Sequence, residues 1–144
     1  MIHRTTKTIA SWLGVLIGIG GINHGFFEAL QGSTPTPGLL IQAIGPVQRY
    51  WLFGTEEAFT IVPNFMVTGI LAMLVGAAVI VWSLCCLQRK HAATVFILLC
   101  VLLFLVGGGI GQVLFFTLIW LGATRIRGSL AWWKRALPEK IRPV

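Results

Sequence analysis

Residues 92–124 read AATVFILLCVLLFLVGGGIGQVLFFTLIWLGAT and contain no charged side chain over 33 positions. As a single helix this stretch would be about 50 Å long, whereas about 20 residues suffice to cross the hydrocarbon core of a bilayer. The run GGGIG at residues 107–111 lies near its midpoint, where glycines weaken a helix. We therefore predict a helical hairpin with transmembrane spans at about residues 89–107 and 110–126.

The composition places the whole chain in a membrane. Of its 144 residues, 56% are hydrophobic and 10% are charged, and the mean hydropathy is +0.87. Soluble domains carry about 25% charged residues, so this chain has too few polar groups to cover a water-exposed surface. A single transmembrane domain comprising residues 1–144 is expected.

Two further spans complete the predicted bundle. Residues 9–30 form an apolar run that is long enough for a first span, and no small-residue cleavage site follows it. Residues 57–87 form the second span. Residues 39–53 are too short and too polar to cross, so they predict a short interfacial helix, and residues 129–137 resemble a C-terminal amphipathic helix. The predicted fold is an all-α integral membrane four-helix bundle with these two additional helices.

The net charge is +7, and the basic residues cluster beside the apolar runs. They lie at Arg4 and Lys7, at Arg89 and Lys90, and between residues 125 and 142. With four spans these clusters share one side, which the positive-inside rule identifies as the cytoplasm. We therefore predict a protein of the cell (inner) membrane with both termini cytoplasmic. Its expected partners are the lipid bilayer with its anionic head groups and a second copy or another membrane protein, but not nucleic acid.

The first span carries a polar stripe towards its outer end. His24, Glu28 and Gln31 occupy positions i, i+4 and i+7, so they share one helix face. Ionisable groups at membrane depth are costly and tend to face the interior of a bundle or a wet cavity. Beside the stripe runs a seam of small residues that lets helix backbones approach closely in lipid, formed by Gly14, Gly18, Gly21 and Gly25.

The second span contributes polar residues on the same side of the membrane. On a helix, four of them would fall within about 80° of one another: Glu57, Thr60, Asn64 and Thr68. We predict that both stripes line a pocket that opens outward. Its candidate ligand-binding residues are His24, Glu28, Gln31, Arg49, Glu57, Asn64 and Gln112. A structural interpretation stays open for each of them, as a packing residue, a solvated side chain or a partner of Arg49.

Some of the same residues could also serve a metal or a cofactor. His24, Glu28 and Glu57 are chemically suited to zinc or to acid–base catalysis, and a histidine that faces the bundle can ligate haem. No metal site is predicted, because a histidine beside a glutamate on a helix is more often a hydrogen-bonded packing residue. The chain contains no HExxH motif and no Walker or Rossmann glycine pattern. The cofactor and any catalytic residue are unknown at this level.

The length and the four expected spans are similar to those of small multidrug resistance transporters. Those proteins carry one glutamate within an otherwise apolar first helix, whereas Glu28 lies near the end of its predicted span. The charge bias also opposes the dual topology of that family. The layout is similar to that of DoxX-type small membrane proteins too, but no motif matches residue by residue, so no family is assigned.

Three function classes stay open. The first is a non-enzymatic membrane protein that binds a ligand or a partner through the outer polar pocket. The second is an ion-coupled or small-molecule transporter that acts as an oligomer, with Glu28 or Glu57 titrating. The third is a membrane enzyme or redox protein that uses His24 with these carboxylates. The first is preferred, because no sequence pattern names a reaction.

Overall fold

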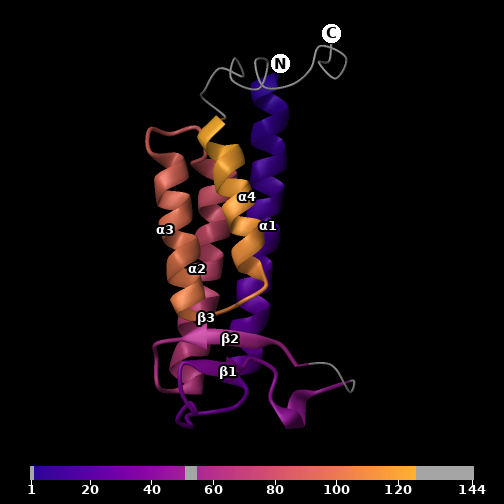
Figure 1. The fold of residues 1–144 in the computed structure, drawn as a ribbon, viewed down its shortest axis with the longest axis vertical. Coiled ribbons are helices and arrows are strands. Elements are labelled where there is room, and N and C mark those ends of the chain that lie inside the picture. The colour runs from indigo at the N-terminus through magenta and orange to yellow at the C-terminus, as the bar shows by residue number, and fades with distance from the viewer. Residues whose placement is uncertain (1, 51–54, 126–144) are drawn as a thin grey trace.

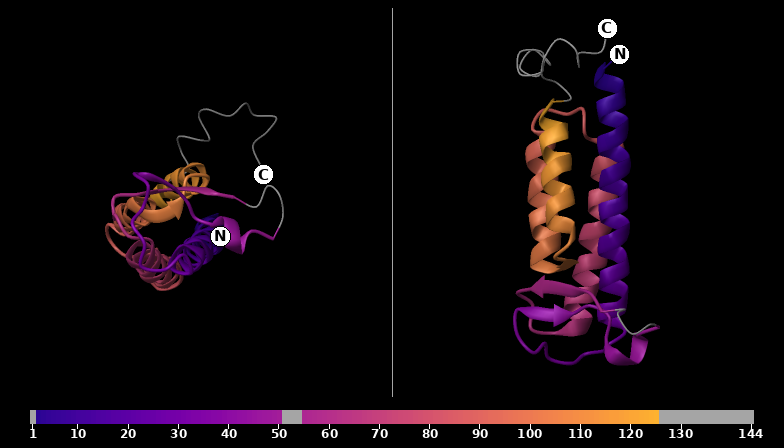
Figure 2. Two further views of the ribbon diagram at one scale, coloured as in Figure 1. Left: turned by 90° about the horizontal axis from the view of Figure 1, so that it is seen from below. Right: turned by 45° about the vertical axis from the view of Figure 1, so that its right-hand side comes forward.

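The computed structural model describes residues 2–50 and 55–125. Four helices lie side by side along one axis, and a small sheet lies across one end of them (Figure 1). In Figure 2 the view from below shows the helices grouped together, and the right-hand view shows them above the sheet. The helices are α1 (Ile2–Ala29), α2 (Phe65–Cys85), α3 (Ala92–Leu105) and α4 (Gln112–Arg125). The described chain is thus mostly helical, as predicted, but it is not all-α.

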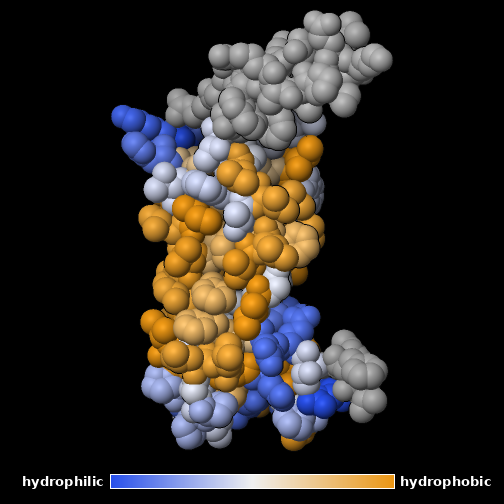
Figure 3. Space-filling model, viewed as in Figure 1, coloured by the Kyte–Doolittle hydropathy of each residue, from blue (hydrophilic) through white to orange (hydrophobic). Residues whose placement is uncertain are grey.

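Two of these helices are long and apolar enough to cross a membrane. They are Arg4–Ala29 within α1, and α2 over its whole length. The helices α3 and α4 are also apolar, but they are shorter. On the face shown in Figure 3, apolar residues form a broad band around the middle of the bundle, and polar residues gather at its two ends.

The predicted glycine seam packs α1 against α2. A Cβ atom at Gly18 would lie 2.6 Å from the carbonyl oxygen of Gly76, and one at Gly76 would lie 2.7 Å from the carbonyl oxygen of Gly18. Gly25 and Gly69 face each other in the same way, about two helical turns further along α1. The two backbones can approach this closely only because neither helix carries a side chain at these positions. The glycine seam therefore packs two helices of the same chain against each other.

The hairpin of α3 and α4 covers the other side of this pair. Gly21 of the seam faces Leu103 of α3, and a Cβ atom there would lie 2.8 Å from both methyl carbons of the leucine. Leu103 belongs to a buried apolar cluster that also contains Phe96 of α3 with Phe116 and Ile119 of α4. The cluster also includes Ala72 and Val79 of α2, so the core of the bundle runs between all four helices and ends at Val106 of β3.

The sheet has three antiparallel strands in the order β1 (Leu40–Gln42), β2 (Glu57–Thr60) and β3 (Val106–Gly109). Leu40 pairs with Phe59, and Ala58 pairs with Gly109. Every residue of β3 is buried, and the strand joins α3 directly to α4. Three consecutive glycines leave room around this strand: Gly107 and Gly109 face the side chains of Glu28 and His24 on α1, and Gly108 faces Leu103 of α3.

The interfacial helix predicted at residues 39–53 is wrong. In the described part of this region, residues 40–42 form strand β1, and Pro46–Gln48 form a single turn of 3-10 helix, η1. Gly45 and Pro46 oppose a longer helix, since proline lacks an amide donor and restricts the residue before it. The backbone of β1 is instead satisfied by β2, a partner that is distant in the sequence.

The helix of the predicted second span begins later than predicted, at Phe65 rather than at residue 57. Asn64 is the N-cap of α2, and its side-chain oxygen accepts a hydrogen bond from the amide of Val67 at 3.1 Å. Pro63 directly precedes this cap, and residues 57–60 form β2. The predicted helical stripe from Glu57 to Thr68 is therefore wrong, because half of it lies on a strand.

The predicted break of the 92–124 run is confirmed in its position. Helix α3 ends at Leu105 and α4 begins at Gln112. The form of the break differs from the tight turn that was predicted, because β3 runs between the two helices and pairs with β2. The predicted amphipathic helix at residues 129–137 lies outside the described residues.

Candidate functional site

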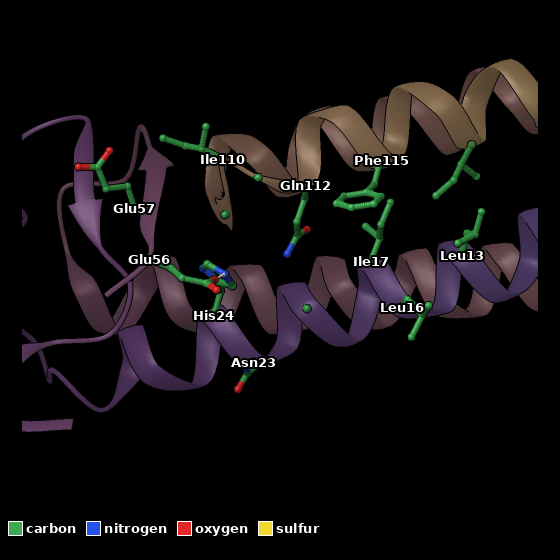
Figure 4. A pocket seen from close by; sticks show the side chains of 14 residues that line it. Leu13, Leu16, Ile17, Asn23, His24, Glu56, Glu57, Ile110, Gln112 and Phe115 are labelled. Atoms are coloured by element: carbon green, nitrogen blue, oxygen red, sulfur yellow. Dashed lines mark ion pairs between the residues drawn. The ribbon is translucent and has the colours of Figure 1, made fainter. Parts of the chain in front are cut away.

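A groove with a volume of about 710 Å³ lies between α1 and α4, next to the sheet. In Figure 4 the helix axes run across the picture, and the sheet lies at one end of the groove. Helix α1 forms one wall, the start of α4 forms the other, and residues of β2 and β3 close the end. The groove therefore depends on all three parts of the fold.

The part of the groove that is distant from the sheet is apolar. Leu13, Leu16 and Ile17 line it from α1, and Phe115 and Ile119 line it from α4. Their spacing of three or four residues puts the members of each set on one helix face. Leu16 and Phe115 are exposed, so this part of the groove is open along its side.

The part next to the sheet is polar. His24 of α1 is buried, with its side chain 8% exposed, and its Nε2 forms an ion pair with the carboxylate of Glu56, which is 65% exposed. Gln112 extends from the first turn of α4 towards α1 (Figure 4). Asn23 and Glu57 complete the polar lining. The groove therefore changes from apolar to polar along its length.

The β2–β3 pairing brings Glu56 to His24. Ala58 lies opposite Gly109, and the carbonyl oxygen of Glu57 accepts a hydrogen bond from the amide of Ile110 at 3.2 Å. On the other side, the carbonyl oxygen of Glu56 accepts a hydrogen bond from the amide of Ala43 at 2.9 Å. Because neighbouring residues of an extended chain point in opposite directions, Glu56 meets His24 while Glu57 points away from it (Figure 4).

Two glycines of β3 make room for the polar face of α1. A Cβ atom at Gly109 would lie 2.6 Å from Nε2 of His24, and one at Gly107 would lie 2.6 Å from a carboxyl oxygen of Glu28. Gly107 also has φ +106, which side-chain-bearing residues rarely adopt. Since the two glycines are two residues apart on one strand, both polar side chains of α1 pack on the same strip of backbone.

Glu28 is fully buried behind the groove and does not line it. Neither of its carboxyl oxygens has a hydrogen-bond partner among the described residues, and the same holds for Nδ1 of His24. An ionised carboxylate in such a place would be costly without a compensating partner. Glu28 therefore contributes a buried polar group next to the groove rather than a surface for a ligand.

The other predicted residues hold the outer loops in place. Gln31 donates hydrogen bonds from Nε2 to the carbonyl oxygens of Gln42 and Ala43, both at 2.9 Å. Asn64 caps α2 and donates to Oγ of Ser33 at 3.2 Å. Arg49 is partly buried, forms no ion pair with a described residue, and does not line the groove.

Of the seven predicted residues, the structure thus places His24, Glu57 and Gln112 along one groove and Glu28 directly behind it. Glu56 was missed, although it makes the ion pair. The alternation of an extended chain at residues 56–60 separates Glu56 from Glu57, but the sequence predicts a helical span over residues 57–87 that begins just after Glu56. Thr60 and Thr68 do meet, with their Oγ1 atoms 2.6 Å apart, from β2 and α2 rather than from one helix.

The described residues contain no group of three His, Cys, Asp or Glu side chains that could hold a metal ion. His24, Glu28 and Glu57, considered together in the sequence for zinc, are consequently not gathered into such a group. No protein-family model, curated protein or solved structure matches this chain.

Proposed function

We propose that the chain is an integral membrane protein that crosses the bilayer four times, with both termini cytoplasmic. The low burial of its two long helices supports the membrane environment, and the distribution of basic residues supports the orientation. Only 39% of the apolar window in α1 and 33% of that in α2 is buried inside the bundle, whereas the core helix of a soluble protein is mostly buried. Many of the exposed side chains are large and apolar, including Trp12, Leu74 and Leu118. Lipid is the solvent that fits such a surface.

The short α3 and α4 are compatible with this topology. Each has 14 residues and is about 21 Å long, less than the roughly 30 Å of a hydrocarbon core. The strand between them continues the hairpin outward, and all four of its residues are buried. Irregular backbone is tolerated at membrane depth when protein surrounds it. We therefore place β3 within the outer part of the bilayer and β1 nearer its surface.

Within this frame, we propose that the groove binds an elongated amphipathic molecule. The observation that carries the proposal is its graded lining, which is apolar along Leu13, Leu16 and Phe115 and polar at His24 and Gln112. Its volume falls within the range of about 300–1,000 Å³ that is usual for ligand sites. The open side of the groove would let a hydrocarbon chain enter from the lipid, with its head group towards the sheet.

The test compares two tryptophan variants of the same helix. Leu16→Trp fills the apolar part of the groove, whereas Ile19→Trp puts the same side chain at an exposed position that does not line it. The purified protein in a neutral detergent is incubated with single-chain amphiphiles that have 12-carbon chains, and the bound molecules are counted by native mass spectrometry. We expect Leu16→Trp to reduce binding about tenfold or more, because lost apolar contacts of about 1.4 kcal/mol already correspond to a factor of ten.

The control variant Ile19→Trp should bind as the wild type does. Equal binding by all three proteins would contradict the proposal, because it would place the bound amphiphiles on the general apolar surface. A loss of binding in both variants would contradict it as well, since the effect would then not depend on the groove.

A further inference from the structure

The polar end of the groove carries a negative charge that is not balanced by any basic residue of its lining. Glu56 and Glu57 both line this end, and no lysine or arginine does so among the described residues. Glu57 is exposed, and its carboxylate forms no ion pair with a described residue. Even when His24 is protonated and paired with Glu56, the charge of Glu57 stays uncompensated at the groove.

We infer that the groove selects amphiphiles with a cationic amine head group over those with an anionic head group. This inference rests on the proposed function and assigns the chemical class of its ligand. A head group that follows its chain along the groove arrives at His24, and Nε2 of this residue is already occupied by Glu56. An incoming group therefore meets the exposed carboxylate of Glu56, and an ammonium group can donate hydrogen bonds to it.

His24 adds a buried polar group to this end of the groove. Its side chain is only 8% exposed, it lines the groove, and its Nδ1 has no hydrogen-bond partner among the described residues. A buried polar atom without a partner is uncommon in folded proteins. Beside it, the amide of Gln112 extends into the groove from α4 (Figure 4). The two exposed carboxylates therefore lie at the end of the groove where its other polar residues gather.

The positive charges of this end of the molecule are too few or too distant to reverse the selectivity. Arg49 is the only basic residue described between α1 and α2, and it does not line the groove. The first turn of α4 also points its amides towards this end, but a helix N-terminus is equivalent to only about half a positive charge. The two negative charges of Glu56 and Glu57 are larger than this partial positive charge.

The test measures the head-group preference with chains of equal length. The full-length protein in a neutral detergent at pH 7 is titrated with dodecylamine, dodecanol and laurate, and binding is followed by native mass spectrometry. We expect the amine to bind best and laurate worst, with about a tenfold difference between them at low salt. Raising the salt concentration to about 1 M should shrink this difference, because exposed charges are screened.

Glu57→Gln removes one charge of the groove, leaves its backbone bonds to the sheet in place, and should shrink the ratio of amine to laurate binding about threefold or more. Lys90→Gln removes a charge at the opposite end of the bundle and should leave this ratio unchanged.

If the three amphiphiles bind equally well but lose binding in Leu16→Trp, the proposed function stands and the cationic preference is wrong. If laurate binds best, the inference is overturned in the same way. If none of them binds to the wild type, both proposals fail together.

Discussion

At the scale of single residues, the glycines of β3 and the polar side chains of α1 form matched pairs. Gly109 leaves the space that the ring of His24 occupies, and Gly107 leaves the space for the carboxyl group of Glu28. The ring of His24 is in turn held in place between this glycine and the carboxylate of Glu56. The polar end of the groove therefore depends on the absence of a methyl group at one position of a neighbouring strand.

Gly109→Ala is expected to destabilise the protein by about 1–3 kcal/mol, because overpacking a closed site forces its neighbours to move. The change should be measured as a shift of the thermal unfolding midpoint in detergent, followed by circular dichroism. Gly111→Ala is the matched control, since a Cβ atom there would have no neighbour within 4 Å, and it should change stability by less than about 0.5 kcal/mol.

A double variant tests whether the loss of stability comes from the contact between Gly109 and the ring of His24. In a His24→Ala protein the imidazole is gone, so adding Gly109→Ala should cause little further loss of stability. An unchanged penalty in that background would show that the glycine is required by the strand itself and not by the ring of His24.

At the scale of elements, α1 and α2 are joined through their backbones. The pairs Gly18 with Gly76 and Gly25 with Gly69 allow this approach over the length of the contact. In the proposed bilayer environment the hydrophobic effect would not drive the helices together, so close van der Waals packing would have to hold them. The pair forms the frame to which the α3–β3–α4 hairpin is attached.

Gly69→Ala should weaken this frame. Its Cβ atom would lie 2.6 Å from the backbone nitrogen of Ala29, and backbone atoms cannot move aside as a side chain can. We expect a loss of about 1–3 kcal/mol in the free energy of unfolding, measured by thermal unfolding in detergent.

Gly122→Ala is the control for this element, because a Cβ atom at this position of α4 would have no neighbour within 4 Å. It should stabilise the protein by up to about 1 kcal/mol through the higher helix propensity of alanine. Equal effects of the two variants would mean that the seam contributes no close packing.

At the scale of the whole molecule, charge and polarity differ between the two ends. Arg4, Lys7, Arg89 and Lys90 lie at the end where α1 begins and where α2 is connected to α3. The sheet and the loops with Glu56 and Glu57 lie at the other end (Figure 1). The proposed orientation, in which the basic end faces the cytoplasm, is the one that the positive-inside rule favours.

This orientation can be tested with single cysteines. In a background where Cys85, Cys86 and Cys100 are replaced by alanine, Ser33→Cys puts a thiol in the outer loop and Lys90→Cys puts one in the opposite loop. A membrane-impermeant maleimide applied to intact cells should label position 33 only, and position 90 should become labelled after permeabilisation. Labelling of both positions in intact cells, or of position 90 alone, would contradict the proposed topology.

The sequence by itself determined the features that depend on local chemistry. The uncharged run from residue 92 to residue 124 and its glycines predicted two helices and the place of the break between them. The spacing of His24 and Glu28 put both on one face of α1, and the seam that includes Gly18 predicted close helix packing. Such features follow from helix period and from side-chain size, which are properties of neighbouring residues.

Only the tertiary structure decided the sheet and the composition of the groove. Residues 57–60 and 106–109 are strands because they pair with each other, and nothing in either segment alone reveals a partner that lies almost fifty residues away. That pairing brings Glu56 to His24 and leaves Glu57 pointing away from it. Strand pairing is a non-local interaction, so side-chain placement that depends on it cannot be derived from a helical period.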